Sequence, residues 1–398
     1  MRTTPFHERT SAANETGLWS HWAGHAVATK YRIDEKVEYF AVRQAAGVLD
    51  TSALFKYRIT GPDAERLLSG VLARDITKCR PGQAQYTMWC DDQGFLIEDG
   101  VVLRISGDEY WLTSAEPNLA YLQGMIGHQR VEVEDISDDF GILAVQGPAS
   151  RTVLSALVPE VAELSFFGLT QAKIGDAPVV ISRTGYTGDL GYEIWVERND
   201  AIAIWDAVFE ASAGRGVLPY GSMVMHMTRI EAALLLIEVD FESSRFAWVD
   251  EQKATPIELG YGWMFRRLER DDRAFVGRKA IEQELATGSS RFRLVGLDVD
   301  WASYQLAHRA LGLPALKDHV PVEWATMVHD DAGQVAGHAS SFMYSPLLQR
   351  HIALARVSPR LAAVGTDLSI DVTINNRNYP VEAAVRRLPF YDPPHKVG

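Results

Sequence analysis

Three glycines, Gly185, Gly188 and Gly191, recur at intervals of three residues between residues 182 and 196. Because glycine has no Cβ, a segment with this spacing lets the backbone pass close to another part of the chain. Residues 192–196 then alternate in the manner of a β-strand. The stretch predicts a glycine-punctuated hairpin around which the remaining elements must pack.

The strand that ends this segment places a carboxylate among aromatic rings. If Ile194 and Val196 face the core, Tyr192 shares their face, while Glu193 and Trp195 point to the other. An ionised carboxylate accepts two hydrogen bonds at once, which suits a planar ligand with neighbouring N–H donors. On spacing alone, an ordinary hairpin with one exposed glutamate remains the alternative.

The string Arg183-Thr184-Gly185-Tyr186-Thr187-Gly188, followed by Gly191-Tyr192-Glu193-Ile194, resembles the signature of the folate-dependent aminomethyltransferase family, typified by the T-protein of the glycine cleavage system. Other matching segments are 47–52, 60–64, 228–232, 275–280 and 388–391. The resemblance covers nearly the full length. It implies an α+β fold, a multi-domain cloverleaf of mixed α/β folate-binding domains with a small antiparallel C-terminal β-barrel. It also implies tetrahydrofolate as cofactor.

Length and composition limit the number of domains and the kinds of partner that this chain can have. A chain of 398 residues is too long for one core, which favours two or three domains. The net charge of −13 argues against a nucleic-acid partner. No apolar run reaches the length of a membrane helix, and residues 1–16 lack the apolar centre of a secretory signal, so we expect no membrane partner and a cytoplasmic location.

The chain offers no recognisable metal or dinucleotide motif. Cys79 and Cys90 are its two cysteines, and neither belongs to a Cys-x-x-Cys pair. The histidines form no His-Glu-x-x-His pair, and no Gly-x-Gly-x-x-Gly stands between a strand and a helix. We therefore expect no metal centre and no built-in dinucleotide domain, and the proposed chemistry needs neither metal nor flavin.

A Gly-Ser-Ser sequence at residues 288–290 marks the expected domain boundary. Residues 1–287 would form the folate-binding region, as two interleaved α+β subdomains, and residues 288–398 the barrel. The barrel is predicted from short strands at 291–298, 333–340, 352–357, 367–374 and 380–385. Within the first region, the composition of residues 223–236 predicts a helix.

A second candidate site lies in a predicted hairpin between residues 85 and 103, whose later strand contains Glu98 and Asp99. Charged residues that keep a strand edge soluble are the alternative explanation. In the family, such a hairpin ends in an acidic pair whose second member is the catalytic aspartate. The resemblance thus implies that Asp99 is catalytic, with Glu98 in place of the usual first aspartate, and that Tyr86 contacts folate.

The remaining candidate residues are assigned to the parts of tetrahydrofolate that each could bind. Glu193 is assigned to the pterin N–H donors, and Tyr86 and Tyr186 to packing or hydrogen bonding around the rings. Arg229 supplies supporting charge within the pocket. Trp263 is a weaker candidate for packing around the same rings. Asp99 would stabilise positive charge on N5 as it takes a carbon, and would receive the released proton.

Residues 237–255 depart from the T-protein pattern in a region that lines the donor channel in the family. We therefore expect a methyl or methylene transfer from a small N-, S- or O-methylated donor to tetrahydrofolate. The alternatives are a true T-protein, for which a carrier protein would dock, and a non-catalytic folate-binding scaffold. The scaffold relatives carry a cysteine motif where this chain has residues 183–188, which contain none. The folate half of a flavin dehydrogenase is disfavoured because no dinucleotide-binding half is present.

Overall fold

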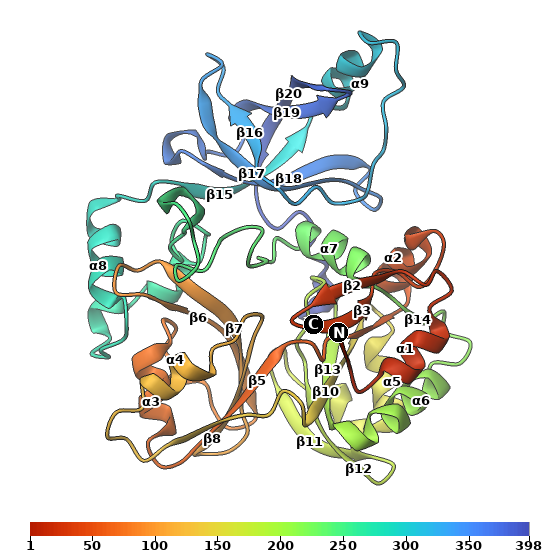
Figure 1. The fold of residues 1–398 in the computed structure, drawn as a ribbon, viewed down its shortest axis with the longest axis vertical. Coiled ribbons are helices and arrows are strands. Elements are labelled where there is room, and N and C mark those ends of the chain that lie inside the picture. Colours follow the sequence, from red (N-terminus) through yellow and green to blue (C-terminus); the bar gives the residue numbers. More distant parts are fainter. Residues whose placement is uncertain (398) are drawn as a thin grey trace.

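The computed structural model describes residues 1–397 and shows three lobes, each built on its own β-structure (Figure 1). Two lobes contain open sheets, of six and five strands, and the third is a closed barrel. A three-stranded sheet of β1 (Arg2–Thr3), β3 (His25–Ala28) and β2 (Trp19–Trp22) adds to the six-stranded lobe. This mixed α+β architecture with a C-terminal barrel confirms the predicted fold class.

The six-stranded sheet contains the glycine-rich segment. Its order is β11 (Leu169–Ile174), β12 (Ala177–Ser182), β13 (Gly191–Glu197), β10 (Phe140–Gln146), β4 (Gly47–Asp50) and β14 (Leu218–Pro219). Helices α5 (Ser150–Leu157) and α6 (Ala201–Ala211) pack on one face, and α1 (His7–Ala13) lies beside α6. On β13, Tyr192, Ile194 and Val196 enter the core beneath these helices, as the alternation predicts.

The five-stranded sheet contains the acidic hairpin. Its order is β6 (Gln83–Cys90), β7 (Leu96–Arg104), β8 (Glu109–Ser114), β5 (Phe55–Thr60) and β9 (Glu132–Asp135). Helices α3 (Ala64–Val71) and α4 (Leu119–Gly124) cover one face, where Leu67, Val102 and Leu122 share a core. All the pairings in this sheet are antiparallel.

The free faces of the two sheets pack against each other. Trp111 on β8 and Trp195 on β13 meet with ring centroids 5.4 Å apart, and Leu103 on β7 joins the same buried cluster. Burying two indoles at one contact provides a large apolar area and fixes how the sheets face. Side chains on the same faces of β7 and β13 as Leu103 and Trp195 therefore point toward the space between the sheets.

The barrel closes in the order β15 (Arg293–Val299), β18 (Arg350–Val357), β17 (Val335–Ser345), β16 (Thr326–His329), β19 (Asp367–Ile374) and β20 (Arg377–Arg386). Helix α9 (Trp301–Arg309) packs against β20. Sequence analysis finds five of these strands but misses β16 and α9. Strand β16 is only four residues long and half exposed, so its apolar pattern is too short to recognise without its partners.

The helices that join the lobes are α2 (Glu35–Gln44), α7 (Ser222–Glu231) and α8 (Arg278–Thr287). The predicted helix at residues 223–236 is too long, because α7 ends at Glu231 and Ala233 adopts a left-handed φ of 54°. Ala232 packs against Gly188, where an added Cβ would lie 2.4 Å from the Ala232 Cβ. The helix thus ends where Ala232 meets Gly188. A contact between distant residues of this kind cannot be read from the composition of residues 223–236.

Short 3₁₀ helices complete the elements: η1 Ile76–Lys78, η2 Pro159–Glu163, η3 Arg198–Asp200, η4 Asp250–Gln252, η5 Gly262–Phe265, η6 Leu268–Arg270, η7 Pro359–Leu361 and η8 Pro394–Lys396. Within residues 1–397, every helix is too short or too polar to traverse a lipid bilayer.

Candidate functional site

The glycine-rich loop wraps around one buried amide, that of Gln146 at the end of β10. A Cβ added to Gly185 would lie 1.9 Å from Gln146 Oε1, and one added to Gly191 would lie 2.2 Å from it. The amide nitrogen donates to the carbonyls of Thr184 (3.2 Å) and Tyr192 (3.3 Å). Glycine is therefore required at both positions by close approach, which explains part of the predicted spacing.

Glu193 faces the space between the two sheets. On β13 it alternates with the core residues and shares the face of Trp195, which packs against the five-stranded sheet. The Thr184 hydroxyl donates to Glu193 Oε2, whereas Oε1 receives no hydrogen bond from residues 1–397. Burial raises the pKa of Glu193 and the Thr184 hydrogen bond opposes this rise. One oxygen of a half-buried acid is therefore left for an external donor.

Asp99 faces the same space from the opposite side. On β7 it shares a face with Leu103, which packs in one cluster with Trp195. The neighbouring strand supplies Tyr86, whose hydroxyl donates to Asp99 Oδ2 at 2.8 Å. The ring of Tyr261 lies 5.3 Å from that of Tyr86. Tyr86 and Asp99, which have separate roles in the predicted folate site, are thus in direct contact.

The environment of Asp99 suits proton transfer. Burial raises the pKa of Asp99 to about 6, and the hydrogen bond from Tyr86 partly offsets this rise. A general base works best when its pKa lies near the operating pH. Asp99 therefore combines an ionised form at neutral pH with enough basicity to accept a proton.

Glu98 points to the other face of the same strand and is fully buried there. Its carboxylate accepts the backbone N–H groups of Asp99 (2.9 Å) and Glu116 (2.8 Å). Burial raises the pKa of Glu98, and the charge of Asp99 adds to the effect. Glu98 thus fixes the backbone on which Asp99 is carried.

Tyr186 connects the glycine-rich loop to the Asp99 side. Its hydroxyl donates to the carbonyl of Leu235. Burial raises the pKa of Tyr186; the charge of Arg229 opposes the rise, and that of Asp99 adds to it. Tyr186 therefore lies within electrostatic range of both predicted site residues, between the loop that leads to Glu193 and the acid on β7.

Arg229 is fully buried, and its contacts are with protein acids. Its guanidinium donates to Asp240 Oδ2 (2.7 Å), to Glu323 and to the Ser341 hydroxyl (2.8 Å). Asp240 lies in the divergent segment, and Glu323 and Ser341 belong to the barrel lobe. Arg229 thus links α7 to the divergent segment and to the barrel lobe. Its supporting role toward folate stays a prediction.

Trp263 borders a cavity of about 400 Å³ and is 42% exposed. The guanidinium of Arg74 lies 5.0 Å from its ring centroid, and the ring centroid of Tyr261 lies 6.2 Å from it. Sequence reasoning missed Tyr261, Arg74 and Asp240. The Gly-Tyr-Gly-Trp string at 260–263 is a signal that would have pointed to Tyr261, whereas Arg74 has no local signal.

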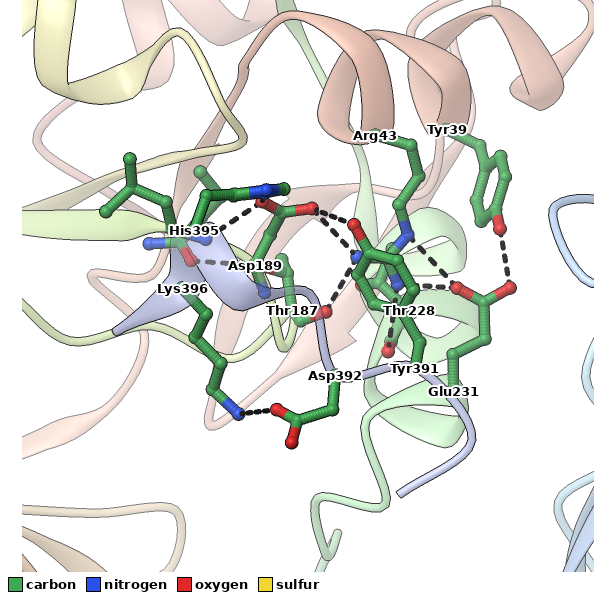
Figure 2. Close-up of polar contacts among 12 residues, drawn as sticks. Tyr39, Arg43, Thr187, Asp189, Thr228, Glu231, Tyr391, Asp392, His395 and Lys396 are labelled. Atoms are coloured by element: carbon green, nitrogen blue, oxygen red, sulfur yellow. Dashed lines mark hydrogen bonds and ion pairs between the residues drawn. The ribbon is translucent and has the colours of Figure 1, made fainter. Parts of the chain in front are cut away.

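The carboxy-terminal tail returns from the barrel and contacts the glycine-rich loop (Figure 2). Asp189, buried in that loop, accepts the Tyr391 hydroxyl at 2.8 Å and lies 2.7 Å from His395 Nε2. Arg43 of α2 pairs with Glu231 of α7 and lies 4.2 Å from the Tyr391 ring centroid. The tail, α2 and α7, three segments distant in sequence, therefore hold the loop that precedes Glu193.

One group of possible metal ligands occurs elsewhere, formed by Asp34, Glu35 and His319. The ammonium of Lys30 already lies 2.7 Å from Glu35, and His319 pairs with the same carboxylate. These contacts make it an ion-pair cluster between α2 and the segment before β16.

Two family models match the chain. The model described as the GCVT N-terminal domain matches residues 6–267, and the model of the glycine cleavage T-protein C-terminal barrel domain matches residues 309–392. The crystal structure of glycine cleavage system aminomethyltransferase T from Bartonella henselae superposes with a TM-score of 0.82, at 22% identity over 98% of each chain. That likeness supports the fold.

Three sequence relatives extend the comparison. The trimethylamine-oxide aldolase of Ruegeria pomeroyi is 32% identical over 98% of this chain, which spans only 47% of that protein. The heme-dependent oxidative N-demethylase gamma subunit of Ectopseudomonas mendocina is 32% identical over 94% of this chain and 92% of its own. An aminomethyltransferase of Clostridium botulinum is 29% identical over 88% of each chain. The chain therefore belongs to the aminomethyltransferase family typified by the glycine cleavage T-protein, a family of enzymes that use tetrahydrofolate.

Proposed function

We propose that this enzyme transfers a one-carbon unit from a small N-methylated donor to tetrahydrofolate. The observation that carries the proposal is the placement of Asp99 and Glu193 on the facing surfaces of two packed sheets. A half-buried acid with one oxygen that accepts no hydrogen bond from residues 1–397 suits the N–H edge of a pterin. A second acid with a pKa near neutrality suits a nitrogen that releases a proton.

Each residue acts on a different part of the ligand. Tetrahydrofolate supplies a nucleophilic nitrogen, N5, that takes the carbon. Glu193 orients the pterin through its N–H donors, while the rings of Tyr86 and Tyr261 form an aromatic wall. Asp99 holds the proton that leaves N5, and the Tyr86 hydroxyl keeps its carboxylate in place.

The divergent segment 237–255 and the relatives' names support an N-methylated donor, within the wider N-, S- and O-methylated class. Asp240 anchors this segment by accepting from Arg229 and from the Leu236 backbone N–H (2.9 Å). Two relatives are named for trimethylamine oxide and for N-demethylation. Methylated amines and their N-oxides are therefore the first donors to test.

Glycine cleavage aminomethyltransferase activity is the second candidate. It is supported by the two family models and by relatives of that name, including the Clostridium botulinum protein. A lipoyl carrier protein would then dock near the donor side. The non-catalytic scaffold is not retained, because the relatives compared above are named as enzymes and the scaffold's cysteine motif is missing at residues 183–188.

A product assay tests the proposal. The protein is incubated with tetrahydrofolate and, separately, with methylated amines, amine N-oxides, sulfonium compounds, methoxyaromatics or an aminomethyl-loaded carrier protein. Mass spectrometry then follows 5-methyl- and 5,10-methylene-tetrahydrofolate. We expect product with an N-methylated donor. Product from the carrier protein alone would favour the T-protein assignment, and absence of product from every donor would contradict both.

The catalytic assignment predicts that Asp99→Asn lowers turnover and leaves folate affinity nearly unchanged. The amide still accepts from Tyr86 but cannot take a proton, and losing one preorganised charge typically costs about 10²–10³ in kcat. Calorimetry and steady-state kinetics separate the two effects. Asp92→Asn, at an exposed position in the turn of the same hairpin, is the matched control. Wild-type turnover in Asp99→Asn would remove Asp99 from catalysis.

A further inference from the structure

Asp189 is an acid of the glycine-rich loop that the proposed chemistry does not use (Figure 2). Its side chain is fully buried. The carboxylate accepts the Leu190 backbone N–H at 2.9 Å and the Tyr391 hydroxyl at 2.8 Å. Nε2 of His395 lies 2.7 Å from it, and Arg43 lies 3.5 Å away. Because burying a carboxylate is unfavourable unless it is paired and hydrogen-bonded, the burial of Asp189 depends on donors from the carboxy-terminal tail.

The tail that supplies these donors, residues 391–397, is attached by polar contacts near both of its ends. The Tyr391 backbone N–H donates to the Glu231 carbonyl at 2.9 Å, and the Lys396 carbonyl accepts from the Arg183 guanidinium at 3.0 Å. Every residue of this stretch is half-buried or exposed. Segments with few buried apolar contacts open locally at much lower free energy than the core. The tail is therefore easier to detach than the sheet beneath the loop is to rearrange.

The loop lies between α7 and the tail. A Cβ added to Gly188, which has a φ of 73°, would lie 2.4 Å from the Ala232 Cβ and 3.8 Å from the carbonyl oxygen of Tyr391. The same loop contains Thr184, whose hydroxyl donates to Glu193. Contacts with the tail therefore act on the segment that orients the carboxylate assigned to the pterin.

We propose that the carboxy-terminal tail is a latch for the pterin end of the folate site, with Tyr391 and His395 as positioning residues that act through Asp189. The inference rests on the proposed function, which assigns Glu193 to the pterin. In the latched state, Asp189 is satisfied and the loop holds Thr184 against Glu193. When the tail detaches, Asp189 loses two donors in a buried position, and the loop must move to hydrate the carboxylate.

The latch and the pterin are coupled because both stabilise one conformation of the loop. Such coupling is reciprocal, so pterin binding should hold the tail in place by the same factor by which the tail strengthens pterin binding. Asp99 lies on β7 in the other sheet and makes no contact with the tail. The latch therefore changes folate affinity and leaves turnover at saturating folate unchanged.

Calorimetry with 6-methyltetrahydropterin tests the positioning role. His395→Ala and Tyr391→Phe should each weaken binding by about 5- to 50-fold, within the usual range of coupling between sites. Tyr391→Phe keeps the ring that packs on Arg43. His395→Gln retains an N–H donor and should restore most of the affinity. Lys396→Gln, which removes only a contact with Asp392 within the tail, is the matched control and should bind as the wild type does. In steady-state kinetics, KM for folate should rise in His395→Ala while kcat stays near the wild-type value.

Hydrogen exchange of the wild-type protein tests the coupling without a substitution. We expect 6-methyltetrahydropterin to slow exchange in peptides from residues 388–397 and from the glycine-rich loop, and to leave strand β19 of the barrel unchanged. Tail exchange that ignores the pterin, unchanged affinity in His395→Ala, or a His395→Gln variant as weak as His395→Ala would overturn the latch while the proposed function stands. Failure of the wild-type protein to bind either 6-methyltetrahydropterin or 5-formyltetrahydrofolate would instead reject the proposed function.

Discussion

At the scale of single residues, two adjacent acids on β7 have different surroundings because side chains alternate along a strand. Glu98 faces the α3–α4 side and satisfies backbone N–H groups, whereas Asp99 faces the space between the sheets and meets Tyr86. An acidic pair in the sequence therefore corresponds to one backbone anchor and one candidate base. The anchor keeps the base from shifting along the strand.

The Tyr86 hydrogen bond predicts a specific pH response. Because the carboxylate form of Asp99 must accept a proton, activity should fall as pH drops through its pKa of about 6. Tyr86→Phe removes a donor that stabilises the carboxylate, so this pKa rises. The acidic limb of the kcat profile should move upward by about 0.5–1 pH unit. Tyr379→Phe, in the barrel, should leave it unmoved, and an unmoved limb in Tyr86→Phe would disprove the coupling.

The assignment of Glu193 to the pterin predicts that Glu193→Gln weakens pterin binding. Glu193→Gln retains an oxygen that can accept from Thr184 but replaces the free carboxylate oxygen with an N–H₂ donor, which repels the pterin donors. Affinity for 6-methyltetrahydropterin should fall about tenfold or more, since a buried unsatisfied polar group costs about 1–3 kcal/mol. Calorimetry measures this, with Glu197→Gln at the exposed end of the same strand as control. Equal affinities would move the pterin anchor elsewhere.

At the scale of elements, the glycine-rich loop is organised from inside by Gln146 and from outside by the tail (Figure 2). The amide donates to the carbonyls of Thr184 in the loop and Tyr192 in β13, which ties the loop to β10. Tyr391 and His395 then cover Asp189 from the opposite side. The loop is thus held on both sides, which fixes the start of β13 and the direction of Glu193.

This packing predicts the effect of a methyl group in the loop. Gly185→Ala would place Cβ 1.9 Å from Gln146 Oε1, so the amide must move or the loop must open. Overpacking of this kind typically lowers the free energy of unfolding by about 1–3 kcal/mol. Chemical denaturation measures the loss. Gly107→Ala, where no atom lies within 4 Å of the added Cβ, should cost much less. Equal stabilities of the two variants would refute the close-approach explanation.

At the scale of the whole molecule, the chain forms three lobes (Figure 1), and a buried charge network joins α7, the divergent segment and the barrel lobe. Arg229 of α7 binds Asp240 of the divergent segment and reaches Glu323 and Ser341 of the barrel lobe. Asp240 also accepts the hydroxyl of Ser340 on β17. The barrel is therefore attached to the site region by a network whose Arg229 and Asp240 lie within electrostatic range of Tyr186. We propose that the domain boundary lies at residues 288–290, between α8 and β15.

Removing one charge from this network predicts a loss of stability. Asp240→Asn leaves the Arg229 guanidinium partly uncompensated in the interior, and breaking a buried pair usually costs about 3–5 kcal/mol. Glu134→Gln removes the partner of Arg58 in an ion pair of which both side chains are more than one third exposed, and should cost less than about 1 kcal/mol. Denaturation followed by tryptophan fluorescence compares them. A cost below that of the surface pair would show that Asp240 does not hold the lobes together.

The sequence by itself determined the local features: the glycine-rich hairpin, the acidic strand with Asp99, most barrel strands and the family. These follow from alternation, turn residues and a long motif, all of which are encoded by neighbouring positions. Tertiary structure alone decided that Asp99 and Glu193 lie on facing surfaces of two packed sheets, and that Arg229 binds Asp240 and Glu323. Such facts depend on which surfaces of separate sheets and lobes meet, because charge compensation and burial are set by contacts between residues far apart in the chain.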